Sequence, residues 1–452
     1  MERVAVLGLA IAGSAVARSL HARGIAVVLA DDAFDGSHAR LADEMGAPVV
    51  DMGEAGAVEA LLDGVDTLIP APGVPPHHRA VEAALARGVT VRSEIDVAYE
   101  WESARPGGPR PIVGITGTDG KTTTTMLTGA LLRASGTEAL EVGNTDLPFM
   151  AALDRPADAF VVECSSFRLA FTPMFRCISS AWLNFAPDHL DWHRTLENYA
   201  AAKARLWSNV RPTDVAVAPS TDRMIRGVAE SSGAHVVTFG GADGDYRVVG
   251  AELVGPSGSI CAVDRLRRSM PHDIANSLAA VALLDAPGLV VATSPSVVST
   301  LESFEPPHHR IEFVGEFGGS RWFNDSKATS PHAALTAIRA FTRLVLIAGG
   351  RNKDLDLSQM ATEPGRMEAV IAIGDDGALI EDAFRGVCPV VRASSMAEAV
   401  ARAAAVARPG VDVLLSPGCT SYDWYANYGE RGNDYMDSVR KFFGSGARRE
   451  GK

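Results

Sequence analysis

The stretch Gly114-Ile-Thr-Gly-Thr-Asp-Gly-Lys121-Thr122 constrains the fold of this chain more than any other feature. It follows the apolar residues Pro111-Ile-Val and leads into a helix-forming segment. The pattern predicts a buried strand, a glycine-rich turn and a helix, which together direct backbone N–H groups at an anion. A purely structural turn is the alternative, but the flanking strand and helix favour a phosphate site.

The residues at the end of this stretch suit a nucleoside triphosphate. Lys121 can reach the terminal phosphates, and the Thr122 hydroxyl can bind Mg²⁺. The spacing departs from the generic G-x-x-x-x-G-K-[ST] pattern at its first position. We therefore expect an ATP site built around residues 114–122.

Short apolar strands alternate with helical segments along most of the chain, which predicts an α/β fold with parallel sheets. The Pro- and Gly-rich segment 101–111 predicts a linker, and SFEPPHHR, near residue 304, predicts a second junction. A length of 452 residues also favours about three domains. We expect a Rossmann-like N-terminal domain, a central mononucleotide-binding domain with the phosphate loop, and a Rossmann-like C-terminal domain, at residues 1–99, 100–304 and 305–452.

Composition argues against several classes of function. The net charge is −13, so we expect no nucleic-acid partner, because phosphate backbones require basic surfaces. No apolar run is long enough to span a bilayer, and we expect no membrane insertion. The five cysteines are scattered without metal-binding spacing, which favours reduced thiols in a cytoplasm.

Other candidate residues follow the next predicted strands. Glu163 closes the apolar run Phe160-Val-Val and could bind Mg²⁺ at a strand end, although a solvated strand-end glutamate is the alternative. His189 lies in a loop after the strand CISSAWLNF and could bind a metal. Lys203 lies in an Ala-rich segment, and its position alone predicts a solvent-facing side chain.

The N-terminal stretch Gly8-Leu-Ala-Ile-Ala-Gly13-Ser14 has only part of a dinucleotide fingerprint. Ala10 stands where that fingerprint has its middle glycine, and Asp31 and Asp32 follow the second predicted strand. This pattern argues against an NAD site.

Many segments resemble, in the same order, those of the Mur ligase family: TGTDGKT, EVGNTD, ECSSF, LNFAPDHLD, YAAAKARLW, PHDIAN, PHHRIE, NDSKATSP and AGGRNKD. NDSKAT and the tail SPGCTSYDWYANYGERGNDY resemble its D-glutamate-adding branch. The resemblance implies an ATP-dependent ligase that joins D-glutamate to UDP-N-acetylmuramoyl-L-alanine through an acyl phosphate. It also implies a cytoplasmic role in peptidoglycan synthesis, and so in cell wall biogenesis, cell shape and cell division.

The resemblance implies an ATP site that extends beyond the phosphate loop. Its implied residues are Gly117, Thr118, Asp119, Gly120, Lys121, Thr122, Thr123, Asn276, Arg310 and Asp325. Two Mg²⁺ ions are implied, with Thr122, Glu163, His189 and Lys203 as their ligands, the lysine as a carbamate. The implied catalytic residues are Lys121, His189 and Lys203. Asp273 stands where relatives usually have Asn, so the contact made by that Asn is not implied here.

The resemblance also implies sites for the two substrates that are joined. The UDP-substrate residues are Ser14, Asp31, Asp32, Gly73 and Asn144, with the N-terminal domain as the main binding unit. The glutamate residues are Lys327, Thr329, Lys353, Ser421 and Tyr428, a set that offers cations and neutral donors to two carboxylates. The residues leave open D- or L-glutamate, another Mur-type or folylpolyglutamate-type ligase, and a non-catalytic nucleotide-binding module. We expect a monomer.

Overall fold

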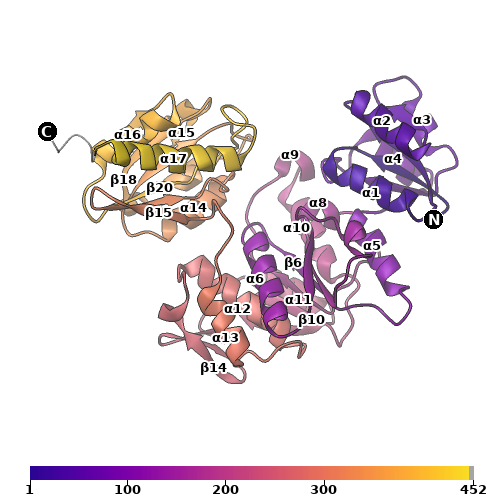
Figure 1. Cartoon of the computed structure of the whole chain (residues 1–452), viewed down its shortest axis with the longest axis horizontal. Helices are drawn as coiled ribbons and strands as arrows, with labels where there is room; N and C mark the ends of the chain where they lie inside the picture. Colours follow the sequence, from indigo (N-terminus) through magenta and orange to yellow (C-terminus); the bar gives the residue numbers. More distant parts are fainter. Residues whose placement is uncertain (447–452) are drawn as a thin grey trace. The chain divides into compact units, whose positions relative to one another are not determined.

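Residues 1–446 are described by the computed structural model, which contains three large sheets flanked by helices and one small antiparallel sheet (Figure 1). The predicted α/β class with three sheet-forming regions is confirmed. Two of the large sheets are wholly parallel, and the third has one antiparallel edge strand.

The N-terminal sheet has the strand order β3-β2-β1-β4-β5. Its strands are β1 (Arg3–Leu7), β2 (Ala26–Asp31), β3 (Val49–Asp51), β4 (Thr67–Pro70) and β5 (Thr90–Val91). The connecting helices are α1 (Ile11–His21), α2 (Gly36–Met45), α3 (Ala57–Leu62) and α4 (Arg79–Ala86). Residues 4–7 of β1 and 27–30 of β2, all Val, Leu or Ala, are buried, as expected for parallel strands covered on both faces.

The middle sheet has the order β11-β10-β9-β6-β8-β7. Its strands are β6 (Ile112–Thr116), β7 (Ala139–Gly143), β8 (Ala159–Glu163), β9 (Ser179–Trp182), β10 (Val215–Pro219) and β11 (His235–Phe239). The helical segments are α6 (Lys121–Ala134), α7 (Phe149–Ala152), α8 (Ser166–Leu169), α9 (Leu190–His193), α10 (Leu196–Ala204), η1 (Arg205–Trp207), α11 (Arg223–Ser231), η2 (Val263–Arg265), α12 (Pro271–Asp285) and α13 (Pro295–Ser303). Because β6 lies between β8 and β9, the loops after all three strands meet at one edge of the sheet.

A small antiparallel sheet follows β11 and was not predicted from the sequence. It contains β12 (Arg247–Val249), β13 (Glu252–Gly255) and β14 (Gly258–Ala262). Tight turns at Gly250 and Gly258, both with positive φ, join these short strands.

The C-terminal sheet has the order β15-β16-β20-β17-β18-β19. Its strands are β15 (Glu312–Phe317), β16 (Ser320–Asn324), β17 (Leu344–Gly349), β18 (Met367–Ile373), β19 (Val390–Arg392) and β20 (Asp412–Leu415). The helical segments are α14 (Pro331–Arg339), η3 (Leu357–Ala361), η4 (Pro364–Arg366), α15 (Gly377–Ala383), α16 (Met396–Val406) and α17 (Tyr428–Gly446). The strands expected in RLVLIAGG, AVIAIGDD and DVLLSPG are confirmed as β17, β18 and β20.

The segment predicted as a linker is partly helical. Helix α5 (Glu94–Ser103) includes its first residues, and Arg110 forms a buried ion pair with Glu102 at 2.6 Å. The Pro and Gly residues therefore mark the short turn after α5 and not an independent spacer.

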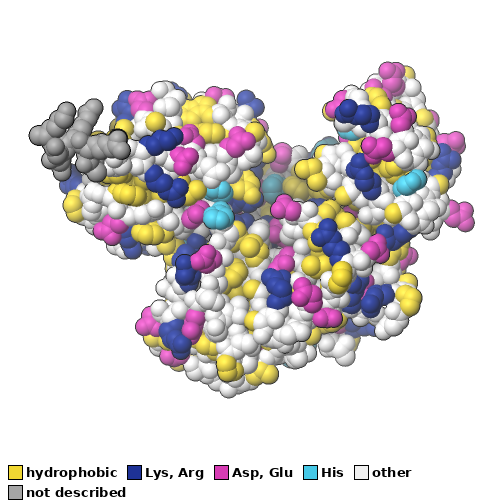
Figure 2. Space-filling view, in the orientation of Figure 1, with side chains coloured by type: hydrophobic (Ala, Val, Ile, Leu, Met, Phe, Trp, Pro, Cys, Tyr) yellow, Lys and Arg dark blue, Asp and Glu magenta, His cyan; other side chains and the backbone are white. Residues whose placement is uncertain are grey.

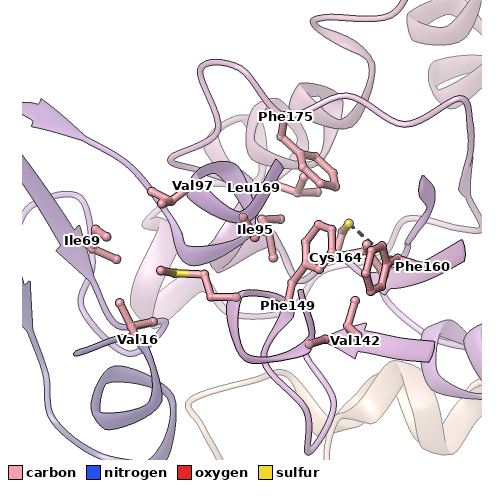
Figure 3. Packing of buried hydrophobic residues seen from close by; sticks show 14 of the residues in the cluster. Val16, Ile69, Ile95, Val97, Val142, Phe149, Phe160, Cys164, Leu169 and Phe175 are labelled. Atoms are coloured by element: carbon pink, nitrogen blue, oxygen red, sulfur yellow. Dashed lines mark hydrogen bonds between the residues drawn. The ribbon is translucent and has the colours of Figure 1, made fainter. Parts of the chain in front are cut away.

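One apolar core continues from the N-terminal sheet into the middle sheet (Figure 3). Val16 and Ile69 of the N-terminal sheet region belong to the same cluster as Ile95 on α5 and Phe149 on α7. Accordingly, the described residues group into two compact units: the first contains most of residues 1–304, and the second contains residues 305–446 with two short segments, 186–188 and 270–272. The three predicted domain ranges stay a prediction.

Acidic and basic side chains are interspersed on the face in Figure 2. In the described part of the chain, no helix is both long and apolar enough to cross a bilayer. All five cysteines are free thiols, as predicted. Burial raises the pKa of the Cys164 thiol to about 12, so this group stays protonated at neutral pH.

Candidate active site

The phosphate loop connects β6 to α6 at the carboxyl edge of the middle sheet. Gly120 precedes α6 with a φ of +81°, which L side chains rarely adopt. A Cβ at this position would also lie 2.6 Å from Asn276 Oδ1. Position 120 therefore requires glycine, and the structure brings the predicted Asn276 against the loop.

Asn184, which sequence reasoning did not select, fixes the shape of the loop. Its Oδ1 accepts the Asp119 N–H at 2.9 Å, and its Nδ2 donates to the Asp119 carbonyl at 3.1 Å. Its own carbonyl accepts the Thr118 N–H at 3.1 Å. The sequence signal that could have identified Asn184 is its position just after β9, the strand that pairs with β6.

Two lysine side chains converge on the loop. Lys121 Nζ donates to the Gly117 and Thr118 carbonyls, both at 2.8 Å, and Lys203 Nζ donates to the Gly117 carbonyl at 2.7 Å. Two lysine side chains thus meet where the sequence predicts phosphates.

The prediction from position alone that Lys203 faces solvent is wrong. Its side chain is 1% exposed and lies 4.7 Å from the centre of the Tyr199 ring. The Ala-rich helix α10 packs this face against the phosphate loop, a long-range contact that helix periodicity does not reveal.

Glu163 ends β8 beside the loop, and it is 1% exposed, so it is not the solvated alternative. Its Oε1 accepts from Asn144 Nδ2 at 2.9 Å, whereas its Oε2 has no hydrogen-bond partner among the described residues. A buried carboxylate oxygen without a partner is costly unless a cation or water satisfies it, so this residue fits the predicted Mg²⁺.

No group of three or more His, Cys, Asp or Glu side chains that could hold a metal occurs among residues 1–446. A divalent ion beside Glu163 would therefore need ligands besides these four side-chain types. Hydroxyl and phosphate oxygens suit Mg²⁺, which uses few protein carboxylates.

His189 belongs to an aromatic cluster beside the loop. Its backbone has a φ of +54°, and its ring lies 4.7 Å from that of Phe167 and 6.2 Å from that of Tyr199. Because Tyr199 also contacts Lys203, one cluster connects His189 with the buried lysine. The neighbouring His193 donates to or accepts from Ser166 Oγ at 2.9 Å.

The N-terminal glycine loop lies at the carboxyl end of β1. A Cβ at Gly13 would approach the Gly8 carbonyl oxygen to 1.7 Å, so only glycine fits there. Asp31 accepts the Leu9 N–H at 2.5 Å and Ser14 Oγ donates to the Leu9 carbonyl, so both of these predicted residues hold the loop.

The remaining predicted UDP-substrate residues have different surroundings. Asp32 is exposed and pairs with His78 at 3.2 Å, and Gly73 is exposed after β4. Asn144 lies after β7 in the middle sheet, where both polar atoms of its side chain are bonded, to Glu163 and to Arg168.

The second unit contains the other predicted ATP and glutamate residues. Asp325 is buried and accepts from Ile311 N–H at 3.2 Å and Ser416 Oγ at 2.7 Å, while Arg310 is half-buried.

Lys327 Nζ lies 3.8 Å from the centre of the Tyr428 ring, which brings two predicted glutamate residues together. Three more of the set are half-buried or buried in this unit: Thr329, Lys353 and Ser421. Lys353 Nζ lies 3.5 Å from Asp188 Oδ1, within the same unit.

Arg431 is a buried arginine that sequence reasoning missed. It is 1% exposed and donates to Ser326 Oγ at 3.0 Å and to the carbonyls of Ser326, Cys419 and Thr420. Burial lowers its pKa to about 10. The arginine ties the segment before Lys327 to the segment before Ser421.

Asp273 forms an ion pair with Arg268 in which both carboxylate oxygens are bonded. Arg268 Nε and Nη2 donate to its two carboxylate oxygens at 2.7 and 2.5 Å. The negative charge of Asp273 on α12 is thereby compensated.

The sheets and the glycine loop with its lysines and buried acid define the molecule as a multidomain α/β nucleotide-binding protein. Family models match three consecutive regions: "Mur ligase MurD-like, N-terminal domain" at residues 2–93, "Mur ligase middle domain" at 115–284 and "Mur ligase, glutamate ligase domain" at 309–419. The chain belongs to the Mur ligase family.

Curated relatives cover nearly the whole chain. It is 36% identical to the UDP-N-acetylmuramoylalanine--D-glutamate ligase of Pelotomaculum thermopropionicum, covering 97% of each chain, and 38% identical to that of Anaeromyxobacter dehalogenans, covering 96% of each. Solved structures share the fold at low identity. The UDP-N-acetylmuramate-alanine ligase of Thermotoga maritima has a TM-score of 0.58 at 17% identity, with 97% of this chain and 99% of that chain covered.

Proposed function

We propose that this chain is an ATP-dependent ligase that adds D-glutamate to UDP-N-acetylmuramoyl-L-alanine during synthesis of peptidoglycan precursors. The relatives named for this reaction align over 96–97% of the chain. The structural observation that carries the proposal is the phosphate loop, where Lys121 and Lys203 meet beside the buried Glu163.

The proposed reaction begins at the phosphate loop. The terminal alanine carboxylate attacks the γ-phosphorus of ATP, an acyl phosphate forms, and ADP leaves. Lys121 stabilises the charge that develops on the phosphoryl oxygens. ATP use is supported by related folds solved with nucleotides, including a MurF ligase from Thermotoga maritima in complex with ADP, with a TM-score of 0.60 at 15% identity, covering 84% of this chain and 95% of that one.

Magnesium is proposed at the same edge of the sheet. When bound, two Mg²⁺ ions would neutralise phosphate charge during phosphoryl transfer. Glu163 Oε2 and the Thr122 hydroxyl would hold one ion, and His189 and Lys203 would hold the other. We propose that Lys203 acts as a carbamate, formed when its uncharged amine adds CO₂ and releases a proton. Burial makes a bare ammonium costly at this position, and the carbamate supplies oxygen ligands.

The two substrates that are joined are proposed to bind in the N-terminal and C-terminal regions of the chain. Ser14, Asp31, Asp32 and Gly73 would bind the uridine diphosphate group, because the first two hold the glycine loop after β1 and the other two follow its neighbouring strands β2 and β4. Lys327, Thr329, Lys353, Ser421 and Tyr428 would bind the carboxylates of glutamate. Its amine then attacks the acyl phosphate, and phosphate leaves from the tetrahedral species to give the amide.

The biological setting follows from the substrates. Nucleotide-linked precursors are made in the cytoplasm, so we propose that the enzyme acts there, as a monomer, in cell wall biogenesis. Its product would support cell shape and cell division.

Phosphate release across a panel of nucleotide precursors and amino acids tests the proposal. We expect release only with ATP, UDP-N-acetylmuramoyl-L-alanine and D-glutamate together, and a product with one added glutamate by mass spectrometry. Turnover with a different precursor or amino acid would assign another Mur-type or folylpolyglutamate-type ligase. Nucleotide binding without release for any pair would assign a non-catalytic module.

A further inference from the structure

Four polar side chains form a line from the N-terminal glycine loop region to the acid at the phosphate loop. Glu94, the first residue of α5, lies 3.6 Å from Arg168 on α8. Arg168 Nη1 donates to Asn144 Oδ1 at 3.0 Å, and Asn144 Nδ2 donates to Glu163 Oε1 at 2.9 Å. Hydrogen bonds therefore connect Arg168 to the carboxylate that the proposed function assigns to magnesium.

The chemistry of this line fixes the direction of the Asn144 amide. A guanidinium only donates hydrogen bonds and a carboxylate only accepts them. The amide oxygen must therefore face Arg168, and the amide nitrogen must face Glu163. Asn144 is exposed, so without Arg168 its amide would be held from one side only.

Most of the line is buried in an apolar core. Glu94, Arg168 and Glu163 are at most 6% exposed. Figure 3 shows their chain neighbours Ile95, Leu169 and Cys164 packed with Phe149 and Phe160. Water competes little for hydrogen bonds in such surroundings, so each bond has a strong orienting effect.

The other end of the line faces a small cavity at the glycine loop. Gly13, Ala71, Ser93, Glu94 and Arg168 are among the residues that line this cavity, which has a volume of about 10 Å³. Ser93 Oγ, Glu94 Oε2 and Arg168 Nε have no hydrogen-bond partner among the described residues. Arg168 Nε lies 3.6 Å from Glu94 Oε2, and its Nη1 is bound to Asn144.

We propose that Arg168 is a positioning residue for the metal site. By holding the Asn144 amide, it fixes the Glu163 carboxylate so that Oε1 is occupied and Oε2 stays available to a divalent cation. Glu94 compensates the buried charge of Arg168. The inference rests on the proposed function, because it takes Glu163 as a metal ligand.

The test measures metal binding directly, by titrating Mn²⁺ into the full chain with saturating ADP and following its electron paramagnetic resonance signal. The test variant is Glu94→Gln/Arg168→Met, which removes the donor and leaves no unpaired buried charge. We expect Mn²⁺ affinity to fall about tenfold or more, the usual effect of losing a partner of a metal ligand. ADP affinity without metal is expected to stay within about twofold, because neither Glu94 nor Arg168 belongs to the phosphate loop.

A matched control is Glu102→Gln/Arg110→Met, which removes another buried Arg–Glu pair of the same unit. We expect it to retain Mn²⁺ affinity. Should the first variant fail to fold, Arg168→Lys is the second test: it keeps a charge and a donor but cannot reach Glu94 and Asn144 together. We expect Arg168→Lys to lower Mn²⁺ affinity by about threefold or more.

Unchanged Mn²⁺ affinity in the folded Arg168 variants would overturn the inference. Glu163→Gln separates this failure from that of the proposed function. If Glu163→Gln loses Mn²⁺ while the Arg168 variants retain it, only the role of Arg168 is wrong. If Glu163→Gln also retains Mn²⁺, the magnesium role of Glu163 is wrong, and the inference fails with it.

Discussion

Lys121 supplies the positive charge that the proposed phosphoryl transfer needs. Its Nζ is held in the phosphate loop by hydrogen bonds to the Gly117 and Thr118 carbonyls. Replacing Lys121 with Ala removes the cation and its two hydrogen bonds to the loop, and leaves the loop glycines in place. We expect Lys121→Ala to lower the rate of ATP-dependent amide formation about 100-fold or more, the usual cost of losing one charge-stabilising group. Lys441→Ala, on the exposed side of α17, is expected to keep the normal rate.

A near-normal rate for Lys121→Ala, measured by phosphate release, would contradict the assignment of the phosphate loop. The control shows whether removing any lysine from this chain affects the assay.

Gly120 tests the geometry of the loop separately from its charge. In Gly120→Ala the alanine would have to adopt a positive φ, and its Cβ would lie 2.6 Å from Asn276 Oδ1. The left-handed conformation alone costs about 1–2 kcal/mol for a non-glycine residue, and the close approach adds to it. We expect nucleotide affinity, measured by calorimetry, to fall about tenfold or more.

Gly136→Ala is the matched control for that substitution. Gly136 has a φ of +88° but no atom within 4 Å of an added Cβ. We expect it to lower thermal stability without lowering nucleotide affinity. Equal effects of the two substitutions on affinity would show that the clash with Asn276 has no role.

At the scale of single elements, the loop depends on the strand beside it. Asn184, after β9, makes two side-chain hydrogen bonds to Asp119 in the loop after β6. Each such bond contributes about 0.5–1.5 kcal/mol. We therefore expect Asn184→Ala to weaken nucleotide binding by about tenfold in calorimetry, because the loop loses its fixed shape.

Asn209→Ala provides the comparison. Asn209 Nδ2 also donates to two backbone carbonyls, those of Pro173 and Phe175, but it does not touch the loop. If Asn209→Ala weakens nucleotide binding as much as Asn184→Ala does, the effect reflects general stability and not loop shape.

The strands and the phosphate loop could be predicted because their signals are local. Apolar runs ending in glycine predicted β6, β17, β18 and β20, and the run ending at Glu163 predicted β8. The burial of Lys203 could not be predicted, because it depends on which face of α10 packs against a loop that is distant in sequence. The roles of Asn184, Arg168 and Arg431 were missed for the same reason: each acts through long-range hydrogen bonds.

At the scale of the whole molecule, the shared core explains why the N-terminal and middle sheets form one compact unit. Phe149 on α7 is fully buried in that core. Truncating a buried Phe to Ala typically costs about 3–5 kcal/mol. We expect Phe149→Ala to lower hydrogen-exchange protection in β1 and β6 together, measured by mass spectrometry, and to leave β17 protected.

The reciprocal substitution is Phe384→Ala, whose side chain is fully buried in the second unit. It is expected to lower protection of β17 and to leave β1 and β6 protected. Loss of protection in β6 alone after Phe149→Ala would show that the two sheets unfold independently.

The central claim, that ATP activates an acid by phosphorylating it, is tested most directly by following oxygen. UDP-N-acetylmuramoyl-L-alanine is labelled with a heavy oxygen isotope in both carboxylate oxygens and incubated with ATP and D-glutamate. The acyl-phosphate route transfers one labelled oxygen to each phosphate released and leaves the other in the new amide, as mass spectrometry would show. Unlabelled phosphate formed together with the amide would contradict the account.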